Sequence, residues 1–302
     1  MADRELRPLI ADAGVLFEGP RWRDGVWWVS DIFGRQVSTV SPDGVLTPVL
    51  ALPERPSGLG WLPDGSLLIV SQLDSRILRR HESGKVTVHA DLAHHAGGAR
   101  GLLNDMVVDE DGRAWVGEFG FDYDVRPPTF APANVYRVES DGSVHVAADD
   151  LAFPNGMVLS VDGSELIVGE TFGGRYSAYA IGADGHLGPR RTWAQLGDSP
   201  PPGPLPEMRQ ALTFTPDGCC LDADGRIWSA DPKGRRLVLL EEGGRVVEEV
   251  RAPEGRTFIA CMLGGERGRT LLASVVPSPH DYVSRNGALF TIEVDVPHGG
   301  RP

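Results

Sequence analysis

One pattern of hydrophobic and polar positions recurs six times along the chain: a short apolar run, a tight turn ending in glycine, and a second apolar run. In the third copy Met106–Val108 precedes the turn at Asp111-Gly112, and Ala114–Val116 follows it. An Asp-Gly pair between two such runs is a strong signal of a β-hairpin, because both central residues of the turn tolerate positive φ. The six copies begin at Glu18, Ser57, Asn104, Asn155, Asp217 and Ala260.

Each copy continues into a third and a fourth β-rich run, as in residues 35–40 and 45–50 after the first copy. Repeats of roughly 40 to 50 residues that each hold several strands are typical of radially arranged β-sheets. The pattern predicts an all-β fold: a six-bladed β-propeller with four antiparallel strands per blade, as a single domain over residues 1–302. A β-sandwich or another β-barrel is the alternative, but six copies in a fixed register are hard to place in a sandwich.

The longest interval between copies contains a proline-rich insert at about residues 197–215. The insert directly precedes Asp217, so it must approach the end of the propeller where that residue lies. It could be a lid, a wall of the substrate pocket, a contact in a homodimer, or a passive loop extension. We expect at most one helical turn in it, near residues 206–212.

Composition narrows the classes of partner. A hydrophobic content of 41% with 24% charged residues is ordinary for a soluble protein, and no apolar run approaches the length of a membrane span. The net charge of −13 disfavours nucleic acids and anionic membranes as partners. Cys219, Cys220 and Cys261 all fall in the first strand of a copy, which favours buried thiols in a reducing compartment. No secretory signal is recognisable, so we expect a cytoplasmic protein.

The first position of the repeat is where chemistry is expected. Equivalent positions of all blades face one another around the axis of a propeller, and four of these residues carry oxygen donors: Glu18, Asn104, Asn155 and Asp217. Burying them together without a partner would cost several kcal/mol, and the two carboxylates would repel each other. A hard divalent cation resolves both problems, since Ca²⁺ takes 6–8 oxygen ligands and leaves room for water or substrate.

Other interpretations of these four residues exist. Asn155-Gly156 and Asp217-Gly218 could be ordinary turn residues, and Glu18 could simply end a strand. Four oxygen donors that share one repeat position favour the metal site instead. The ring has no His or Cys, which disfavours a zinc site of the usual kind. The sequence thus predicts one divalent cation at the central channel mouth.

Four linked motifs carry a family resemblance. They are Glu18-Gly-Pro-x-Trp22, Asn104-Asp-x-x-x-Asp109-x-x-Gly112-Arg-x-Trp115, Pro154-Asn155-Gly156-x-x-x-Ser160-x-Asp162-Gly163, and Pro216-Asp217-Gly218-x-x-x-Asp222-x-x-Gly225. In this order they resemble the SMP-30/gluconolactonase/LRE-like family, which is similar in turn to the diisopropylfluorophosphatases. The resemblance covers roughly residues 14 to 294.

The resemblance implies a six-bladed propeller with one divalent metal at the channel mouth, usually Ca²⁺ and sometimes Zn²⁺, Mg²⁺ or Mn²⁺. It implies Glu18, Asn155 and Asp217 as metal ligands. It places Asn104 beside the metal, bound directly or through substrate or water. These are the residues that the repeat selects independently.

The sequence departs from the family at the substrate. The sugar-lactonase members have an Arg two residues before the Asn that corresponds to Asn104, whereas this chain has Leu102, and its nearest arginine is Arg100. The loop after the third hairpin is aromatic where the sugar enzymes are acidic. We therefore expect a small-molecule substrate that is less polar than a sugar acid. The predicted substrate-binding residues are Arg100, Leu102, Glu118, Phe119, Phe121, Phe153 and Phe172.

The expected activity is hydrolysis of a lactone or a related small ester. The metal would polarise the carbonyl, with Asp217 as general base or nucleophile and Asn104 as the second catalytic residue, orienting the substrate. A non-hydrolytic isomerase, cyclase or lyase could use the same site, and a non-catalytic binding module is less favoured because it needs no such ring. His94, His95 and His280 are weaker candidates. The acidic residues that end four second strands look structural: Asp31, Glu118, Glu170 and Asp231.

Overall fold

A computed structural model describes residues 4–93, 102–121 and 128–300 of the chain. The predicted residues Arg100, His94 and His95 lie outside this part. Within the described residues, no helix combines the length and apolar character that a membrane crossing needs.

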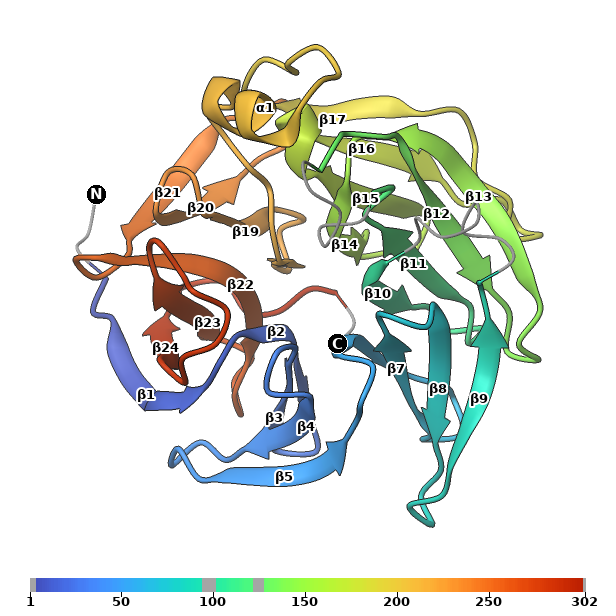
Figure 1. The fold of residues 1–302 in the computed structure, drawn as a ribbon, viewed down its shortest axis with the longest axis horizontal. Helices are drawn as coiled ribbons and strands as arrows, with labels where there is room; N and C mark the ends of the chain where they lie inside the picture. Colours follow the sequence, from blue (N-terminus) through green and yellow to red (C-terminus); the bar gives the residue numbers. More distant parts are fainter. Residues whose placement is uncertain (1–3, 94–101, 122–127, 301–302) are drawn as a thin grey trace.

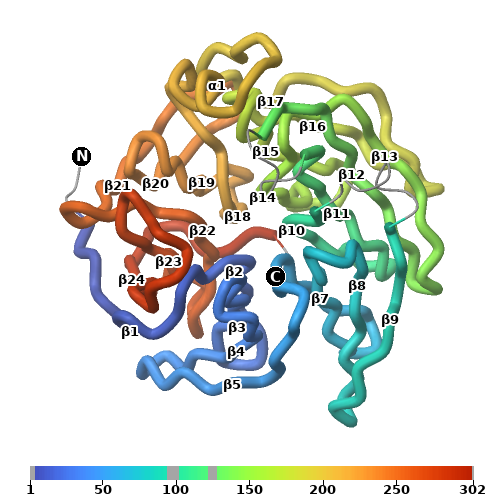
Figure 2. The backbone as a smooth tube through the Cα atoms, viewed as in Figure 1, coloured from blue at the N-terminus to red at the C-terminus, as the bar shows by residue number. Residues whose placement is uncertain are grey.

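Six four-stranded antiparallel sheets surround a central axis, as Figures 1 and 2 show. The prediction of a six-bladed all-β propeller is confirmed. The first three blades, from the inner strand outward, are β2 (Phe17–Arg23), β3 (Val26–Asp31), β4 (Gln36–Val40) and β5 (Leu46–Ala51); β6 (Pro56–Trp61), β7 (Leu67–Ser71), β8 (Arg76–Arg80) and β9 (Val86–Asp91); and β10 (Leu103–Val108), β11 (Ala114–Glu118), β12 (Ala133–Val138) and β13 (Val144–Leu151).

The other three blades follow the same order, except for the outer strand of the last. They are β14 (Pro154–Leu159), β15 (Glu165–Glu170), β16 (Arg175–Ala180) and β17 (Arg191–Gln195); β18 (Cys219–Leu221), β19 (Ile227–Asp231), β20 (Arg236–Leu240) and β21 (Val246–Arg251); and β22 (Arg256–Gly264), β23 (Thr270–Pro277), β24 (Gly287–Glu293) and β1 (Arg7–Gly14). A 3-10 helix, η1 (Thr171–Gly173), follows β15.

The last blade combines a strand from near the start of the sequence with three strands from near its end. Strand β1 pairs antiparallel with β24, with Arg7 opposite Thr291 and Gly14 opposite Gly287. Ile10 on β1 belongs to the same buried cluster as Leu289 on β24. The strand closes the ring of blades, and the repeat does not predict it because β1 precedes the first copy.

Close approach of the inner strands explains a glycine that recurs one residue after the ring position. A Cβ built on Gly58 would lie 2.5 Å from Met106 N of the next blade, and one on Gly156 would lie 2.4 Å from Asp217 O. Since real Cβ atoms essentially never come so close, only glycine fits without a shift of the backbone. The narrow centre of the propeller therefore depends on these positions.

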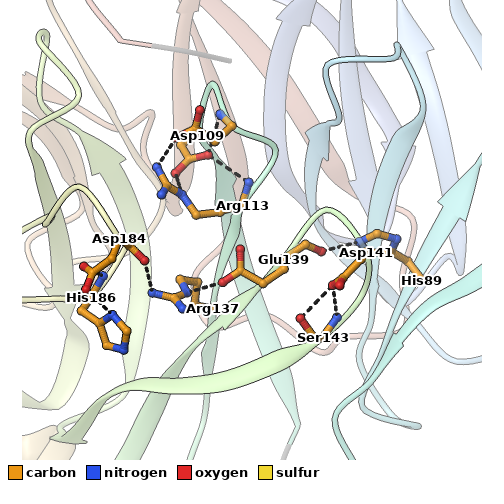
Figure 3. Close-up of polar contacts among 10 residues, drawn as sticks. His89, Asp109, Arg113, Arg137, Glu139, Asp141, Ser143, Asp184 and His186 are labelled. Carbon is orange, nitrogen blue, oxygen red and sulfur yellow. Dashed lines mark hydrogen bonds and ion pairs between the residues drawn. The ribbon is translucent and has the colours of Figure 1, made fainter.

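Polar contacts join neighbouring blades at the hairpin-turn end of the strands, and Figure 3 shows those between the second, third and fourth blades. His89 Nε2 on β9 lies 3.1 Å from Glu139 O, directly after β12. Arg137 Nη1 on β12 donates to Asp184 O of the next blade at 3.3 Å. Arg137 is only 6% exposed, so its charge is held by this contact and by Glu139 at 2.6 Å.

The insert before the fifth blade contains a helix, α1 (Leu205–Ala211), which is longer than the single turn expected. Its buried residues Leu205 and Met208 pack on a cluster that includes Phe121, Phe153 and Phe172. In Figure 1 the helix lies beside β17, at the periphery of the ring. The insert is thus ordered by an apolar surface that the rest of the chain supplies.

Candidate metal centre

The four predicted ligands lie at one end of the channel, each at or just before the start of an inner strand. Glu18 is on β2, Asn104 on β10 and Asn155 on β14, and Asp217 lies two residues before β18. The strand register shifts next to the first three, between Glu18 and Arg21, Leu103 and Met106, and Pro154 and Met157. Such β-bulges re-aim side chains and are frequent beside active sites.

Hydrogen bonds and electrostatics connect all four. Asn155 Nδ2 donates to Asp217 Oδ1 at 2.6 Å, and Asn104 Nδ2 donates to Pro154 O, the neighbour of Asn155, at 3.3 Å. Glu18 is close enough to Asp217 for that carboxylate to raise its pKa. The structure therefore brings the predicted ring together.

The ionised forms of the two ring carboxyls, Glu18 and Asp217, are both disfavoured. Burial raises the pKa of Glu18 well above its usual value, and Asp217 and Asp105 raise it further. Burial raises the pKa of Asp217 to about 7, although hydrogen bonds from Asn155 and the Gly218 backbone lower it. Both shifts have the same cause: the site concentrates negative charge in surroundings that solvate it poorly.

This chemistry fits an oxygen-binding divalent cation. Across the described ranges, no three His, Cys, Asp or Glu side chains form a group that could hold a metal. The ring is of another kind, because two of its four donors are asparagine amides. Carboxylate and amide oxygens suit Ca²⁺ or Mg²⁺ better than Zn²⁺. Glu18, Asn155 and Asp217, with Asn104 beside them, could hold such an ion.

Buried carboxylates at the ends of second strands fix the backbone that leads into three of the ring positions. Each accepts hydrogen bonds from main-chain N–H groups two or three residues upstream of a ligand. The pairs are Asp31 with Val15 and Leu16, Glu170 with Ala152, and Asp231 with Thr215, at 2.8 to 3.1 Å. These acidic residues therefore hold in place the segments that carry the predicted ligands.

Sequence reasoning missed Thr171, which orients two of the predicted ligands. Its Oγ1 accepts from Asn155 Nδ2 at 3.2 Å and donates to Pro216 O, next to Asp217, at 2.7 Å. The hydroxyl thus fixes the Asn155 amide and the segment before β18 together. Its place, directly after the acidic residue at the end of a second strand, is the signal that could have found it.

A second missed feature is a buried ion pair beside the ring, between Arg21 and Asp105. Asp105 follows Asn104 directly, at the repeat position where four copies have glycine. Comparing only the first position of the copies hides this difference. The next position along the repeat would have revealed it.

The predicted substrate residues divide into two groups. Phe121, Phe153 and Phe172 are 3%, 6% and 2% exposed, because α1 covers them. Phe119 is partly buried and meets the Phe153 ring edge-on at 4.6 Å. Leu102 is half-buried directly before β10. Most of this aromatic surface thus packs against protein, and Leu102 and Phe119 have the exposure that a ligand contact needs.

Glu118 and His280 are also at the ring end of their blades. Glu118 ends β11 and is buried; its Oε1 accepts from Asn134 N at 2.9 Å, and burial raises its pKa to about 7. His280 lies in the loop between β23 and β24, where its ring meets Tyr282 edge-on at 4.9 Å. Burial lowers the pKa of His280.

A cavity of about 500 Å³ lies at the opposite end of the channel. Its walls include the hairpin turn at Asp162 and Gly163 and the C-terminal segment His298–Gly300. This segment is tied to the fifth blade, since Ala223 N donates to Pro297 O at 2.8 Å. Because none of the predicted ligands lines it, the cavity is separate from the ring of predicted ligands.

Comparison with known proteins shows which proteins this chain resembles. The family model described as SMP-30/Gluconolactonase/LRE-like region matches residues 16–276. The chain is 26% identical to the 6-deoxy-6-sulfogluconolactonase of Pseudomonas putida, over 98% of this chain and 97% of that protein. It is 28% identical to the L-arabinolactonase of Azospirillum brasilense, over 97% and 89%.

Among solved structures, a calcium-binding protein, regucalcin, from Agrobacterium tumefaciens superposes with a TM-score of 0.78 at 21% identity. The match covers 99% of this chain and 97% of that one. At this identity the likeness supports the propeller fold.

Proposed function

Because this chain belongs to the SMP-30/gluconolactonase/LRE-like family, we propose that it is a divalent-metal-dependent hydrolase of a lactone or a related small ester. The observation that carries the proposal is the ring of two carboxylates and two amides linked at one end of the channel. Two relatives that align over nearly the whole chain are lactonases. We propose Ca²⁺ as the ion, with Mg²⁺, Mn²⁺ and Zn²⁺ as alternatives.

Glu18, Asn155 and Asp217 would hold the ion, with Asn104 next to it. When bound, the ion supplies Lewis-acid polarisation of the substrate carbonyl. Asn155 Nδ2 fixes one oxygen of Asp217 and so sets the plane of the carboxyl group. Without the ion, burial raises the pKa of Asp217 to about 7. A bound dication would favour the ionised carboxylate, which can take a proton from an attacking water and return it to the leaving oxygen.

Asp217 could instead attack the carbonyl directly as a nucleophile. Both roles need the same residue in the same place, and Asn104 would orient the substrate in either. The Pro154 carbonyl holds the Asn104 Nδ2, which fixes the amide beside the ring. We further propose a substrate less polar than a sugar acid, because Leu102 and Phe119 offer it apolar surface.

The test is hydrolysis of a panel of lactones, aryl esters and organophosphates by protein stripped with a chelator and then supplied with Ca²⁺, Mn²⁺ or Zn²⁺. We expect turnover that requires the added ion. Asp217→Asn should lower kcat by about a hundredfold or more, as loss of a general base does. Asp162→Asn is the matched control, since Asp162 is exposed in a turn at the other end of the channel.

Turnover that survives chelation, or that survives Asp217→Asn, would contradict the proposal. Silence across the whole panel from a protein that binds the ion would favour a non-hydrolytic reaction at the same ring. This second function is supported by Leu102, which stands where the sugar-lactonase members of the family have an arginine.

A further inference from the structure

A guanidinium group is buried in the propeller beside the ring. Arg21 lies on β2, the strand of Glu18, and is only 5% exposed. Its Nη2 is 3.1 Å from Asp105 Oδ1 and donates to Met106 O at 2.5 Å, while its Nη1 donates to Pro20 O at 2.8 Å. Since β2 belongs to the first blade and β10 to the third, this side chain reaches past the second blade.

The partner carboxylate is unusual for its position. Asp105 is the second residue of the third copy, where Gly19, Gly58, Gly156 and Gly218 stand in four others. Those glycines allow the inner strands to approach closely. A charged side chain there, 9% exposed, is costly to bury unless it is paired and hydrogen-bonded. Arg21 and the Met106 N–H, at 2.8 Å, provide that pairing.

The charges beside the ring then balance in a specific way. Asp105 acts electrostatically on both Glu18 and Asp217, so the three carboxylates share one environment. With all three carboxylates ionised, as cation binding requires, Arg21 adds one positive charge to their three negative charges, so this buried group would have a net charge of minus two. One divalent cation neutralises this charge. Without the guanidinium, three buried carboxylates would face a single dication with one charge in excess.

We propose that Arg21 is a positioning residue for the divalent cation: it neutralises Asp105, ties β2 to β10, and thereby sets the charge of the ring to match one dication. The inference rests on the proposed metal site. It extends that site from the ligands to the Arg21 guanidinium, which touches none of the reacting atoms. In the same proposal, Asp105 supplies the negative charge that Arg21 neutralises.

The test measures the Kd for Ca²⁺ alone by calorimetry, at fixed pH and ionic strength, on chelator-stripped protein. Asp105→Asn leaves the Arg21 charge uncompensated beside the ring, so the Kd should rise about tenfold or more. Adding Arg21→Met removes that charge and should return the Kd to within about threefold of the wild type, because the two effects are coupled. A purely structural role predicts that the double variant binds no better than the single one.

Arg23 supplies the matched control. It lies on the same strand, but its side chain is partly exposed over the Trp61 ring and pairs with Asp24. Arg23→Met combined with Asp105→Asn makes the same change in net charge outside the ring, so the Kd should stay at the Asp105→Asn value. Unfolding of each stripped variant establishes that it is folded.

Three results separate the possibilities. The inference is overturned, while the metal site stands, by either of two results. One is a wild-type Kd for Ca²⁺ in Asp105→Asn; the other is an Asp105→Asn, Arg21→Met double variant that binds Ca²⁺ as weakly as Asp105→Asn alone. A wild-type protein that binds no divalent cation refutes the proposed metal site itself. If Asp105→Asn does not fold, Arg21→Lys and Arg21→Gln replace it: a wild-type Kd in the first with tighter binding in the second supports the charge role, and equal Kd values overturn it.

Discussion

Glu118 illustrates how far its surroundings can move the protonation of a single buried carboxyl. Its side chain ends β11, is 3% exposed and accepts a hydrogen bond from Asn134 N. Burial is the largest influence on its pKa and raises it from 4.5 to about 7, whereas the hydrogen bonds lower it. The folded protein therefore holds this proton at pH values where the unfolded chain has released it.

Glu118→Gln should flatten the dependence of stability on pH. The wild-type proton contributes stability that is fully present below about pH 4.5 and is lost as pH rises through about 7, so the wild-type free energy of unfolding should fall by up to about 3 kcal/mol relative to the variant across that range. Urea unfolding at several pH values measures this. Glu266→Gln, at an exposed position, is the control, and parallel curves for wild type and Glu118→Gln would contradict the expectation.

Where one position repeats around the ring, the sequence predicts which residues lie together. Glu18, Asn104, Asn155 and Asp217 follow from that symmetry, and the structure links them. Thr171 and Arg21 do not follow from it, because each contacts a residue of another segment that only the folded chain brings near. Partners across the channel depend on bulges and on blade spacing, which no single copy of the repeat encodes.

At the scale of elements, α1 is the departure from an otherwise regular alternation of strands. The expected turn at residues 206–212 is a seven-residue helix that starts at Leu205. Lys233 Nζ donates to the carbonyl of Arg209 near its end, at 2.9 Å. A helix this short is not stable alone, so its packing on Phe121 and its neighbours holds it.

Met208→Ala should therefore destabilise the protein. The side chain is 3% exposed in the aromatic cluster, and its truncation removes buried apolar surface and leaves a cavity, at a cost of about 2 to 5 kcal/mol. Chemical unfolding gives the value. Glu207→Ala, on an exposed neighbour in the same helix, should change it by less than about 0.5 kcal/mol. Equal effects of the two variants would mean that α1 does not pack as described.

The strands were predictable because Asp-Gly turns and apolar runs are local signals. The burial of Phe121, Phe153 and Phe172 under α1 was not, since the sequence shows aromatic residues near one rim but not what covers them. Their predicted contact with substrate stays a prediction. The same reasoning applies to the insert, whose composition left four interpretations open and whose packing partner lies in two other blades.

At the scale of the whole molecule, the ring of blades depends on β1. The repeat predicts six blades but leaves the outer edge of the last one open, because its fourth strand comes from the other end of the described chain. An open strand edge presents unpaired backbone groups, and pairing with β1 satisfies those on the outer side of β24, so that β1 becomes the outer edge of the sheet. The sixth blade is thus the one whose strands are furthest apart in sequence.

Ile10→Asp should loosen this closure. Ile10 is buried against the last blade, so a carboxylate there would be desolvated without a partner, and the free energy of unfolding should fall by about 3 kcal/mol or more. Ala11→Asp introduces the same residue at an exposed position of β1 and should leave the free energy of unfolding nearly unchanged. Amide hydrogen exchange in β24 should accelerate in the first variant only; protected β24 amides in Ile10→Asp would show that β1 is dispensable for closure.

The pairing of β1 with β24 also has a consequence in time. During translation Arg7–Gly14 leaves the ribosome first, and its partner, Gly287–Glu293, follows some 270 residues later. At about 5–20 residues per second, this delay is on the order of ten seconds to a minute. The nascent chain must carry a β-forming segment without its partner through all of that interval. The first blade, which contains Glu18, can dock against the last one only after the strands β22 to β24 have been synthesised.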